Sequence, residues 1–282
     1  MSAGAKPGTL YVVATPIGNL EDITYRAARV LGEVALIACE DTRHSQKLLV
    51  HYGIRRPVIS LYRENEAQRA GELVSRMEAG EDVALITDAG APTLSDPGAR
   101  LVERAVAAGL RVTPLPGPSA PVAALMASGS DAPATFAGFL PSRTGERQRW
   151  LQGWRARGSG NLVVFEAPHR LLAALADMAE VLGPERRLVV ARELTKLHEE
   201  FIRGTVAEVQ QRFAAQAPQG EFTLVVLAAD PAAQQAAARA RADQDLAPGM
   251  SRDELKRLAR ATGMGKSELY RRMQQLRGKI KD

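Results

Sequence analysis

Short apolar runs alternate with longer amphipathic segments through the first 120 residues, and this alternation constrains the fold more than any other feature of the chain. Five apolar runs have the length and composition of buried strands, at residues 9–15, 35–39, 58–61, 83–87 and 111–116. The segments between them have helical periodicity, and several end on a glycine of the kind that follows a helix C-terminus. Alternating strands and helices predict an α/β fold with a mostly parallel, doubly wound sheet.

A second α/β set follows a segment at 116–134 that is bounded by proline, glycine and serine, which we interpret as a helical connector. Because the apolar run at 199–205 follows the run at 187–193 after only a short break, we expect an antiparallel hairpin and therefore a mixed second sheet. The expected strands of this sheet lie at 135–140, 161–167, 187–193, 199–205 and 221–229, with helices near 145–156, 169–182 and 205–217.

The last fifth of the chain has a different composition. Residues 230–247 are rich in Ala and Gln, which predicts a linker or a loose helix. Ser251 and Glu254 then have the spacing of a capping box and begin two short helices separated by TGMG, a hairpin of helix-turn-helix size. The predicted organisation is an N-terminal α/β domain (8–120), a connector (121–134), a second α/β domain (135–229), a linker (230–247) and a small helical tail (248–282).

Basic side chains gather in this tail. Residues 251–282 carry ten Lys and Arg against four Asp and Glu, a net charge of +6, whereas the whole chain has a formal charge of +5. The other 250 residues therefore sum to −1. Such an asymmetry is typical of polyanion binding, and a merely solvated helical tail is the alternative that charge alone leaves open.

The composition also excludes several classes of protein. The single cysteine, Cys39, has no partner for an intramolecular disulfide, and the sequence has no Cys/His cluster with the spacing of a zinc site, so we expect no metal. It has no run of eighteen apolar residues and no signal-peptide pattern at the start. We therefore expect a soluble, cytoplasmic protein with no membrane contact.

Candidate site residues lie in the loops that follow the strands, because ligands of doubly wound sheets bind beyond the carboxyl ends of the strands. None of these loops contains GxGxxG or the Walker P-loop, which disfavours a dinucleotide-dependent oxidoreductase and a P-loop kinase. Glycine and proline let main chain approach a ligand closely. Asp88 and Asp96 suit ribose hydroxyls or a positive charge better than phosphate. Asp96 and Pro97 also fit the first positions of the next helix, and we expect Asp96 to cap it. The four loops are ATPIGNLED (14–22), CEDTR (39–43), TDAGAPTLSDPG (87–98) and PLPGPSA (114–120).

Six segments in this order resemble the tetrapyrrole methylase superfamily: LYVVATPIGNLEDIT, ACEDTRHSQKLL, ITDAGAPTLSDPG, PLPGPSA, FEAPHR and RELTKLHEEFIRGT. The similarity runs from residue 9 to about residue 229. It is greatest to the branch that methylates the 2′-hydroxyl of a cytidine in the decoding region of 16S ribosomal RNA. Corrin and porphyrin methyltransferases would have a glycine-rich loop after the first strand, where this chain has TPIGNLED.

The resemblance implies an S-adenosylmethionine-dependent methyltransferase that acts on 16S ribosomal RNA or the small ribosomal subunit. It also implies a homodimer, with the cofactor in a cleft between the two α/β domains. The branch usually has threonine where this chain has Ala91, so a side-chain hydrogen bond is lost there. The cofactor contacts that it implies are Asp88, Ala89, Gly90, Ala91, Pro92, Ser119, Ala120, Phe165 and Gly220.

Methylation of a ribose hydroxyl calls for a group that takes the proton. Among the carboxylates expected on the cleft-facing loops, Glu166 and Asp41 are the leading candidates. The basic tail would grip RNA phosphates. Two other functions remain open at this stage: a small-molecule methyltransferase of the same superfamily acting on a corrin or porphyrin, and a non-catalytic RNA-binding assembly factor. The residues expected to contact RNA are Lys256, Arg260, Arg271, Arg272, Arg143 and Arg147.

Overall fold

The computed structural model of the chain describes residues 6–157, 160–230, 246–247, 250–262 and 264–279. Two compact units are present, Met1–Leu227 and Ala228–Asp282. The first unit contains both predicted sheets, and the second contains the basic tail.

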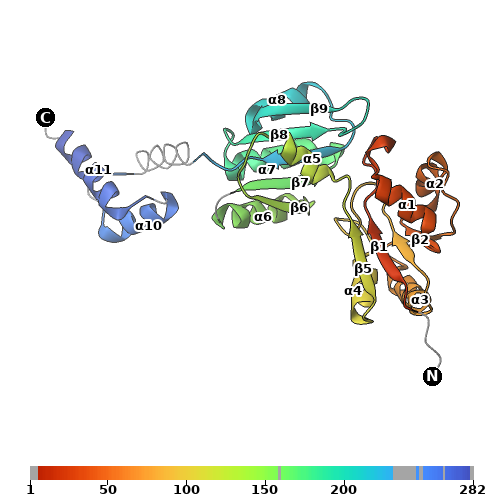
Figure 1. Cartoon of the computed structure of the whole chain (residues 1–282). Coiled ribbons are helices and arrows are strands. Elements are labelled where there is room, and N and C mark those ends of the chain that lie inside the picture. The colour runs from red at the N-terminus through yellow and green to blue at the C-terminus, as the bar shows by residue number, and fades with distance from the viewer. Residues whose placement is uncertain (1–5, 158–159, 231–245, 248–249, 263, 280–282) are drawn as a thin grey trace. The chain divides into compact units, whose positions relative to one another are not determined.

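The first sheet is wholly parallel, with the strand order β3-β2-β4-β1-β5. Figure 1 labels three of its strands, β1, β2 and β5. Helices cover both faces of the central strands of this sheet. The sequence of β4 is therefore an unbroken apolar run, and all three of its residues are buried. One face packs on α3 and α4 and the other on α1 and α2. The predicted doubly wound sheet is confirmed. Its elements are β1 (Thr9–Val13), η1 (Leu20–Asp22), α1 (Tyr25–Glu33), β2 (Leu36–Cys39), α2 (Thr42–His51), β3 (Val58–Ser60), α3 (Glu66–Glu78), β4 (Val83–Leu85), α4 (Ala99–Ala107) and β5 (Arg111–Leu115).

The second sheet is mixed, as predicted, with the order β6-β7-β10-β8-β9. β6 and β7 are parallel, whereas β10 runs antiparallel to both of its neighbours and β8 and β9 form the expected antiparallel hairpin. Helices α6, α7 and α8 share one core with this sheet, and the short α5 packs on its other face. The elements are α5 (Ala120–Met126), β6 (Ala134–Phe139), α6 (Thr144–Ala156), β7 (Asn161–Glu166), α7 (Pro168–Leu182), β8 (Arg187–Arg192), β9 (Glu200–Thr205), α8 (Val206–Ala215) and β10 (Phe222–Val226).

Helix α4 begins later than the Asp96–Pro97 pair predicts. Its N-cap is Gly98, which has a φ of 119°. The free amides at this helix end are satisfied from another helix, because Glu66 Oε1 accepts hydrogen bonds from the backbone amides of Gly98 (2.9 Å) and Arg100 (2.8 Å). The prediction that Asp96 caps α4 is therefore wrong, since a carboxylate of α3 occupies that position.

The second unit is a pair of helices, α10 (Arg252–Thr262) and α11 (Lys266–Lys279). The capping box is confirmed by the Ser251 amide donating to Glu254 Oε2 (2.7 Å) and the Glu254 amide donating to Ser251 Oγ (3.2 Å). Leu255, Leu258 and Leu269 are buried in the small core between the helices. Most of the predicted linker, residues 231–245, lies outside the described residues. Within the part of the chain that the structure describes, the helices are all too short or too polar to cross a membrane.

Candidate active site

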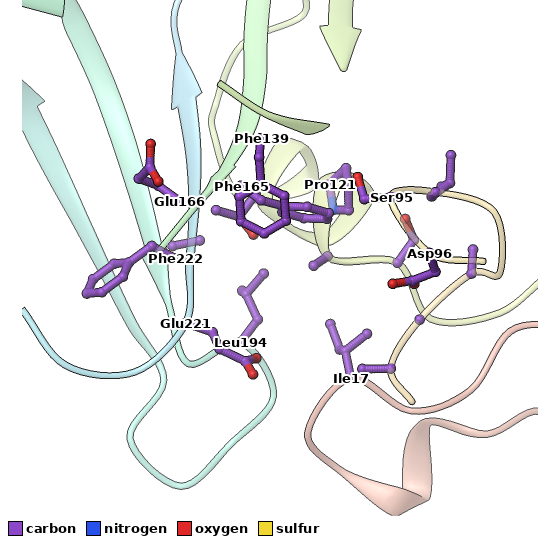
Figure 2. Close-up of a pocket in the computed structure, with 18 of the residues that line it drawn as sticks. Ile17, Ser95, Asp96, Pro121, Phe139, Phe165, Glu166, Leu194, Glu221 and Phe222 are labelled. Atoms are coloured by element: carbon purple, nitrogen blue, oxygen red, sulfur yellow. The ribbon is translucent and has the colours of Figure 1, made fainter. Parts of the chain in front are cut away.

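A cavity of about 370 Å³ lies in the first unit, where the loops after the strands of both sheets meet (Figure 2). Its volume is within the ~300–1,000 Å³ that is usual for small-molecule sites. The walls are mainly apolar, with a few polar groups from the loop after β4 and from β10. The lining residues are Ile17, Ala89, Gly90, Ala91, Leu94, Ser95, Asp96, Ser119, Ala120, Pro121, Phe139, Phe165, Glu166, Ala167, Pro168, Ala191, Leu194, Glu221, Phe222 and Thr223.

The loop after β4 has an unusual backbone. Gly90 and Gly98 have positive φ angles, and so do the non-glycine residues Thr93 (72°) and Ser95 (77°). A non-glycine residue in such a conformation costs roughly 1–3 kcal/mol and persists where the surrounding structure holds it. The sequence contains no signal for the strain at Thr93 and Ser95. Ser95 lines the cavity, and backbone strain at a cavity wall is typical of a functional site.

Gly90 pairs with Thr15, two residues after the end of β1, through two backbone hydrogen bonds. The Gly90 amide donates to the Thr15 carbonyl (3.0 Å), and the Thr15 amide donates to the Gly90 carbonyl (2.9 Å). The Thr15 hydroxyl also donates to the Thr87 carbonyl (3.0 Å). The Gly90 amide already donates to Thr15, so the role of this glycine is to shape the cavity wall. Main-chain amides that could bind a ligand are those of its neighbours Ala89 and Ala91.

Two glycines let the two halves of the first unit approach closely on either side of the cavity. A Cβ atom added to Gly18 would lie 2.8 Å from the carbonyl oxygen of Leu194 and 2.5 Å from Cγ of Lys196. A Cβ atom added to Gly138, at the irregularity in β6, would lie 2.9 Å from Ser95 Oγ. Leu194 and Ser95 both line the cavity, so its width depends on these two contacts.

Asp96 is the carboxylate of the first sheet that faces the cavity. Figure 2 shows its side chain directed toward the space beside Ile17 and Pro121. Burial raises the pKa of this carboxyl, and the nearby negative charge of Asp88 raises it further. The Asp96 carboxylate can face the cavity because Glu66, and not Asp96, accepts the hydrogen bonds of the amides at the start of α4.

Glu166 borders the cavity, but its carboxylate turns to the other face of the second sheet. Successive side chains of a strand alternate between the two faces, so Val164 and Glu166 point to the core under α6 and α7, whereas Phe165 points to the cavity. The Glu166 carboxylate is buried, lies 3.2 Å from Arg170 Nε and accepts from the Ala167 amide (2.9 Å). Burial raises its pKa. Figure 2 shows it pointing away from Asp96.

Asp41 has a local structural role at the start of α2. Its side chain accepts hydrogen bonds from the amides of Arg43 (2.7 Å) and His44 (3.3 Å), and these bonds lower its pKa. Asp41 does not line the cavity. Its own amide donates to Asp88 Oδ1 (3.2 Å), which ties the loop after β2 to the loop after β4.

Six of the nine residues expected to contact a cofactor line the cavity, namely Ala89, Gly90, Ala91, Ser119, Ala120 and Phe165, whereas Asp88, Pro92 and Gly220 do not. Gly220 packs closely against Glu193. A Cβ atom there would lie 2.7 Å from the side chain of Glu193, whose carboxylate accepts from the Glu221 amide (2.8 Å) and from Lys196 Nζ (2.9 Å).

The sequence gives no sign of the cavity residues that come from the loop after β8 and from β6 and β10. Leu194 is the clearest case, since a lone leucine between Glu193 and Thr195 gives no periodic signal. The lining residues missed in this way include Phe139, Leu194 and Thr223, whereas Ile17 lies in the predicted site loop 14–22.

The basic residues expected to contact RNA fall into three groups. Arg147 is buried, and its Nε donates to Asp177 Oδ2 at 2.6 Å, so the prediction that it extends an RNA-binding surface is wrong. Its charge is neutralised within the α6–α7 layer. Arg143 is exposed and lies 3.4 Å from Glu146. In the tail, Lys256 and Arg271 are exposed and Arg272 is half-buried, whereas the side chain of Arg260 lies outside those that the structure describes.

Among the described residues there is no group of three or more His, Cys, Asp or Glu side chains arranged to hold a metal ion.

Comparison with known proteins agrees with this architecture. The family model of tetrapyrrole (corrin/porphyrin) methylases matches residues 9–210. A protein of Pseudomonas aeruginosa named ribosomal RNA small subunit methyltransferase I is 50% identical over 223 residues, 79% of each chain. A protein of the same name from Synechocystis is 44% identical over 93% of this chain and 96% of its own length.

Solved structures of lower identity share the fold. A diphthine synthase has a TM-score of 0.61 at 14% identity and covers 78% of this chain and 89% of its own. A cobalt precorrin-4 methyltransferase has a TM-score of 0.58 at 18% identity and covers 77% of this chain and 94% of its own. On the family match and the curated relatives together, the chain belongs to the tetrapyrrole (corrin/porphyrin) methylase family.

Proposed function

We propose that this chain is an S-adenosylmethionine-dependent methyltransferase of small-subunit ribosomal RNA. The observation that carries the proposal is the similarity to proteins named ribosomal RNA small subunit methyltransferase I, which extends over 93% of this chain in the Synechocystis relative and so includes both sheets and the tail. We further propose that the acceptor is the 2′-hydroxyl of a cytidine in the decoding region, and that the working form is a homodimer in the cytoplasm.

The cavity fits S-adenosylmethionine in size and in chemistry. Ile17, Leu194 and Phe165 offer apolar surface to the adenine and the thioether chain. Asp96 offers a negative charge to a positively charged ligand. Ala89 and Ala91 can offer main-chain groups, and the lack of a hydroxyl at Ala91 leaves these contacts unaffected. When bound, S-adenosylmethionine supplies an electrophilic methyl group. The chain's own contribution is to align the ribose oxygen with it and to keep the cavity dry.

We infer that Asp96 takes the proton of the ribose hydroxyl. Asp96 would accept the proton of the hydroxyl as the ribose oxygen bonds to the methyl carbon; the bond from that carbon to sulfur would break, and the sulfur would leave with the electron pair as a neutral thioether. A raised pKa makes Asp96 a better base at neutral pH. Glu166 is held by Arg170 on the opposite face of the sheet, and the hydrogen bonds that Asp41 accepts at the start of α2 make it a weaker base.

The proposal is tested by single-turnover transfer of a labelled methyl group to small subunits and to protein-free 16S RNA, both taken from cells that lack this protein. We expect label on one ribose, located by mass mapping of nuclease fragments. Label on a base would contradict the assigned acceptor. Transfer to a corrin or porphyrin instead of RNA would identify a small-molecule enzyme. A failure to bind S-adenosylmethionine in calorimetry would identify a non-catalytic RNA-binding protein.

A further inference from the structure

The helical tail contains a groove between the first turns of α10 and α11. Leu255 lies at its base and is 6% exposed, and Tyr270 lies in its wall with 52% of its surface exposed. The neighbours of Tyr270 on α11, Leu269 and Met273, point into the core of the unit. Tyr270 is therefore an aromatic ring that the packing of the two helices leaves at the surface.

Four cations surround this ring. Arg252 and Lys256 of α10 and Lys266 and Arg271 of α11 line the groove, and all four are exposed. Three acids lie in the first turns of the same helices, Asp253, Glu254 and Glu268. Asp253 pairs with one of the four cations, at 2.8 Å from Lys256 Nζ, whereas Glu254 bonds Ser251 in the capping box, so the cations of the groove outnumber the acids. Both helices also begin at this groove, and the first turn of a helix carries a partial positive charge.

An apolar floor, an exposed ring and flanking cations match single-stranded nucleic acid. Every base offers a flat face that stacks on an aromatic side chain, and the phosphates on either side of a stacked base are drawn to Lys and Arg. Unpaired bases of structured RNA are commonly recognised in this way. An acidic peptide would use the cations and leave the ring without a stacking partner.

We propose that this groove binds a single-stranded segment of RNA, with one unpaired base stacked on Tyr270 and the adjacent phosphates held by Arg252, Lys256, Lys266 and Arg271. The choice of RNA rests on the proposed function. The charge of the tail by itself predicts only contacts to phosphates. The stacking of a base on Tyr270 is an additional contact that the proposed function does not include.

The test compares binding of the full-length chain to a short single-stranded RNA and to a strand with the same number of phosphates but no bases. We expect the wild-type chain to prefer the base-bearing strand. Tyr270→Leu should weaken binding of that strand by about 5- to 150-fold and abolish the preference, because stacking contributes about 1–3 kcal/mol per base. Tyr270→Phe should retain it. Tyr25→Leu is the matched control, since Tyr25 is 98% exposed in the first unit.

The salt dependence separates the ring from the cations. Tyr270→Leu should leave the slope of log affinity against log salt unchanged, whereas Lys266→Gln should reduce it by about 0.7, the value for one phosphate contact on a single strand. The inference is overturned if Tyr270→Leu and wild type discriminate equally between the two strands. It is also overturned if polyglutamate binds more tightly than RNA and depends on Tyr270, which would indicate an acidic protein partner. Methyl transfer by the wild-type chain is measured in parallel with RNA binding. A loss of the preference for bases without a loss of methyl transfer counts against the groove alone, whereas an absence of methyl transfer counts against the proposed function.

Discussion

Oε1 of Glu66, in the first turn of α3, accepts a hydrogen bond from the backbone amide of Gly98, 2.9 Å away at the start of α4. The same oxygen accepts from the Arg100 amide at 2.8 Å. A carboxylate at a helix start satisfies free amides and complements the helix dipole. Here that carboxylate comes from 32 residues earlier in the chain, and Asp96 is left to face the cavity.

Replacing Glu66 tests this relationship. Glu66→Ala should lower the free energy of unfolding by about 1–3 kcal/mol, because the amides of Gly98 and Arg100, in a buried and a part-buried hydrogen bond, lose their acceptor. Chemical denaturation gives the difference. Glu72→Ala is the control on the same helix, since Glu72 forms only an exposed ion pair with Arg69, and it should change stability by about 0.5 kcal/mol or less. Equal effects of the two substitutions on the free energy of unfolding would show that the hydrogen bonds of Glu66 contribute no more to stability than an exposed ion pair does.

Asp96→Asn should raise stability and lower activity. A folded-state pKa above the unfolded value means that the folded chain binds the proton more tightly, so ionised Asp96 costs stability once the pH rises through its raised pKa. The variant should therefore melt at a higher temperature than wild type at neutral pH and match it at a pH below the ordinary Asp pKa. Single-turnover methyl transfer at saturating S-adenosylmethionine should fall by about 10²–10⁴-fold. S-adenosylmethionine should still bind, but more weakly, because its positive charge loses the Asp96 carboxylate.

Asp41→Asn is the matched control for Asp96, because the pKa of Asp41 is shifted in the opposite direction. A lowered pKa contributes stability above the unfolded pKa, so this substitution should leave stability at neutral pH unchanged or reduce it. Methyl transfer by Asp41→Asn should stay near wild type. If Asp41→Asn abolished transfer and Asp96→Asn did not, the roles inferred for the two carboxylates would be reversed.

Gly18→Ala should impair the cavity. The new methyl group would lie 2.8 Å from the Leu194 carbonyl oxygen, so the loops of the two sheets must separate. We expect a loss of about 1–3 kcal/mol of stability and weaker binding of S-adenosylmethionine, measured by denaturation and by calorimetry. Gly32→Ala is the control, because a methyl group there meets nothing within 4 Å and lies in α1, where alanine should stabilise by up to about 1 kcal/mol.

Asp177→Ala should be strongly destabilising. Arg147 and Asp177 have side-chain exposures of 2% and 6%, and removing one partner leaves the other charge buried without compensation. A loss of about 3–5 kcal/mol is expected. Arg143→Ala removes an exposed arginine of the same region and should change stability by about 0.5 kcal/mol or less. An effect of Asp177→Ala as small as that of Arg143→Ala would contradict the structural role assigned to Arg147.

The sequence alone determined the two sheets, their parallel and mixed character, and six of the cavity residues. These features depend on local patterns: apolar runs of strand length, helical periodicity between them, and loops rich in glycine and proline after the strands. Residues such as Ala89, Gly90 and Ser119 follow strands directly, so the topology brings them to one edge of the sheet.

Only the tertiary structure decided the roles of the charged side chains. Asp96 looks like a helix cap in the sequence, but Glu66 reaches the same amides from another helix. Arg147 looks like a surface cation, but Asp177 lies 30 residues further along the chain and buries it. Glu166 lies at the carboxyl end of a strand, where a catalytic carboxylate would be expected, but the alternation of β7 turns it toward Arg170. A carboxylate or guanidinium takes its role from the nearest opposite charge or free amide, and that partner is set by contacts between elements far apart in the chain.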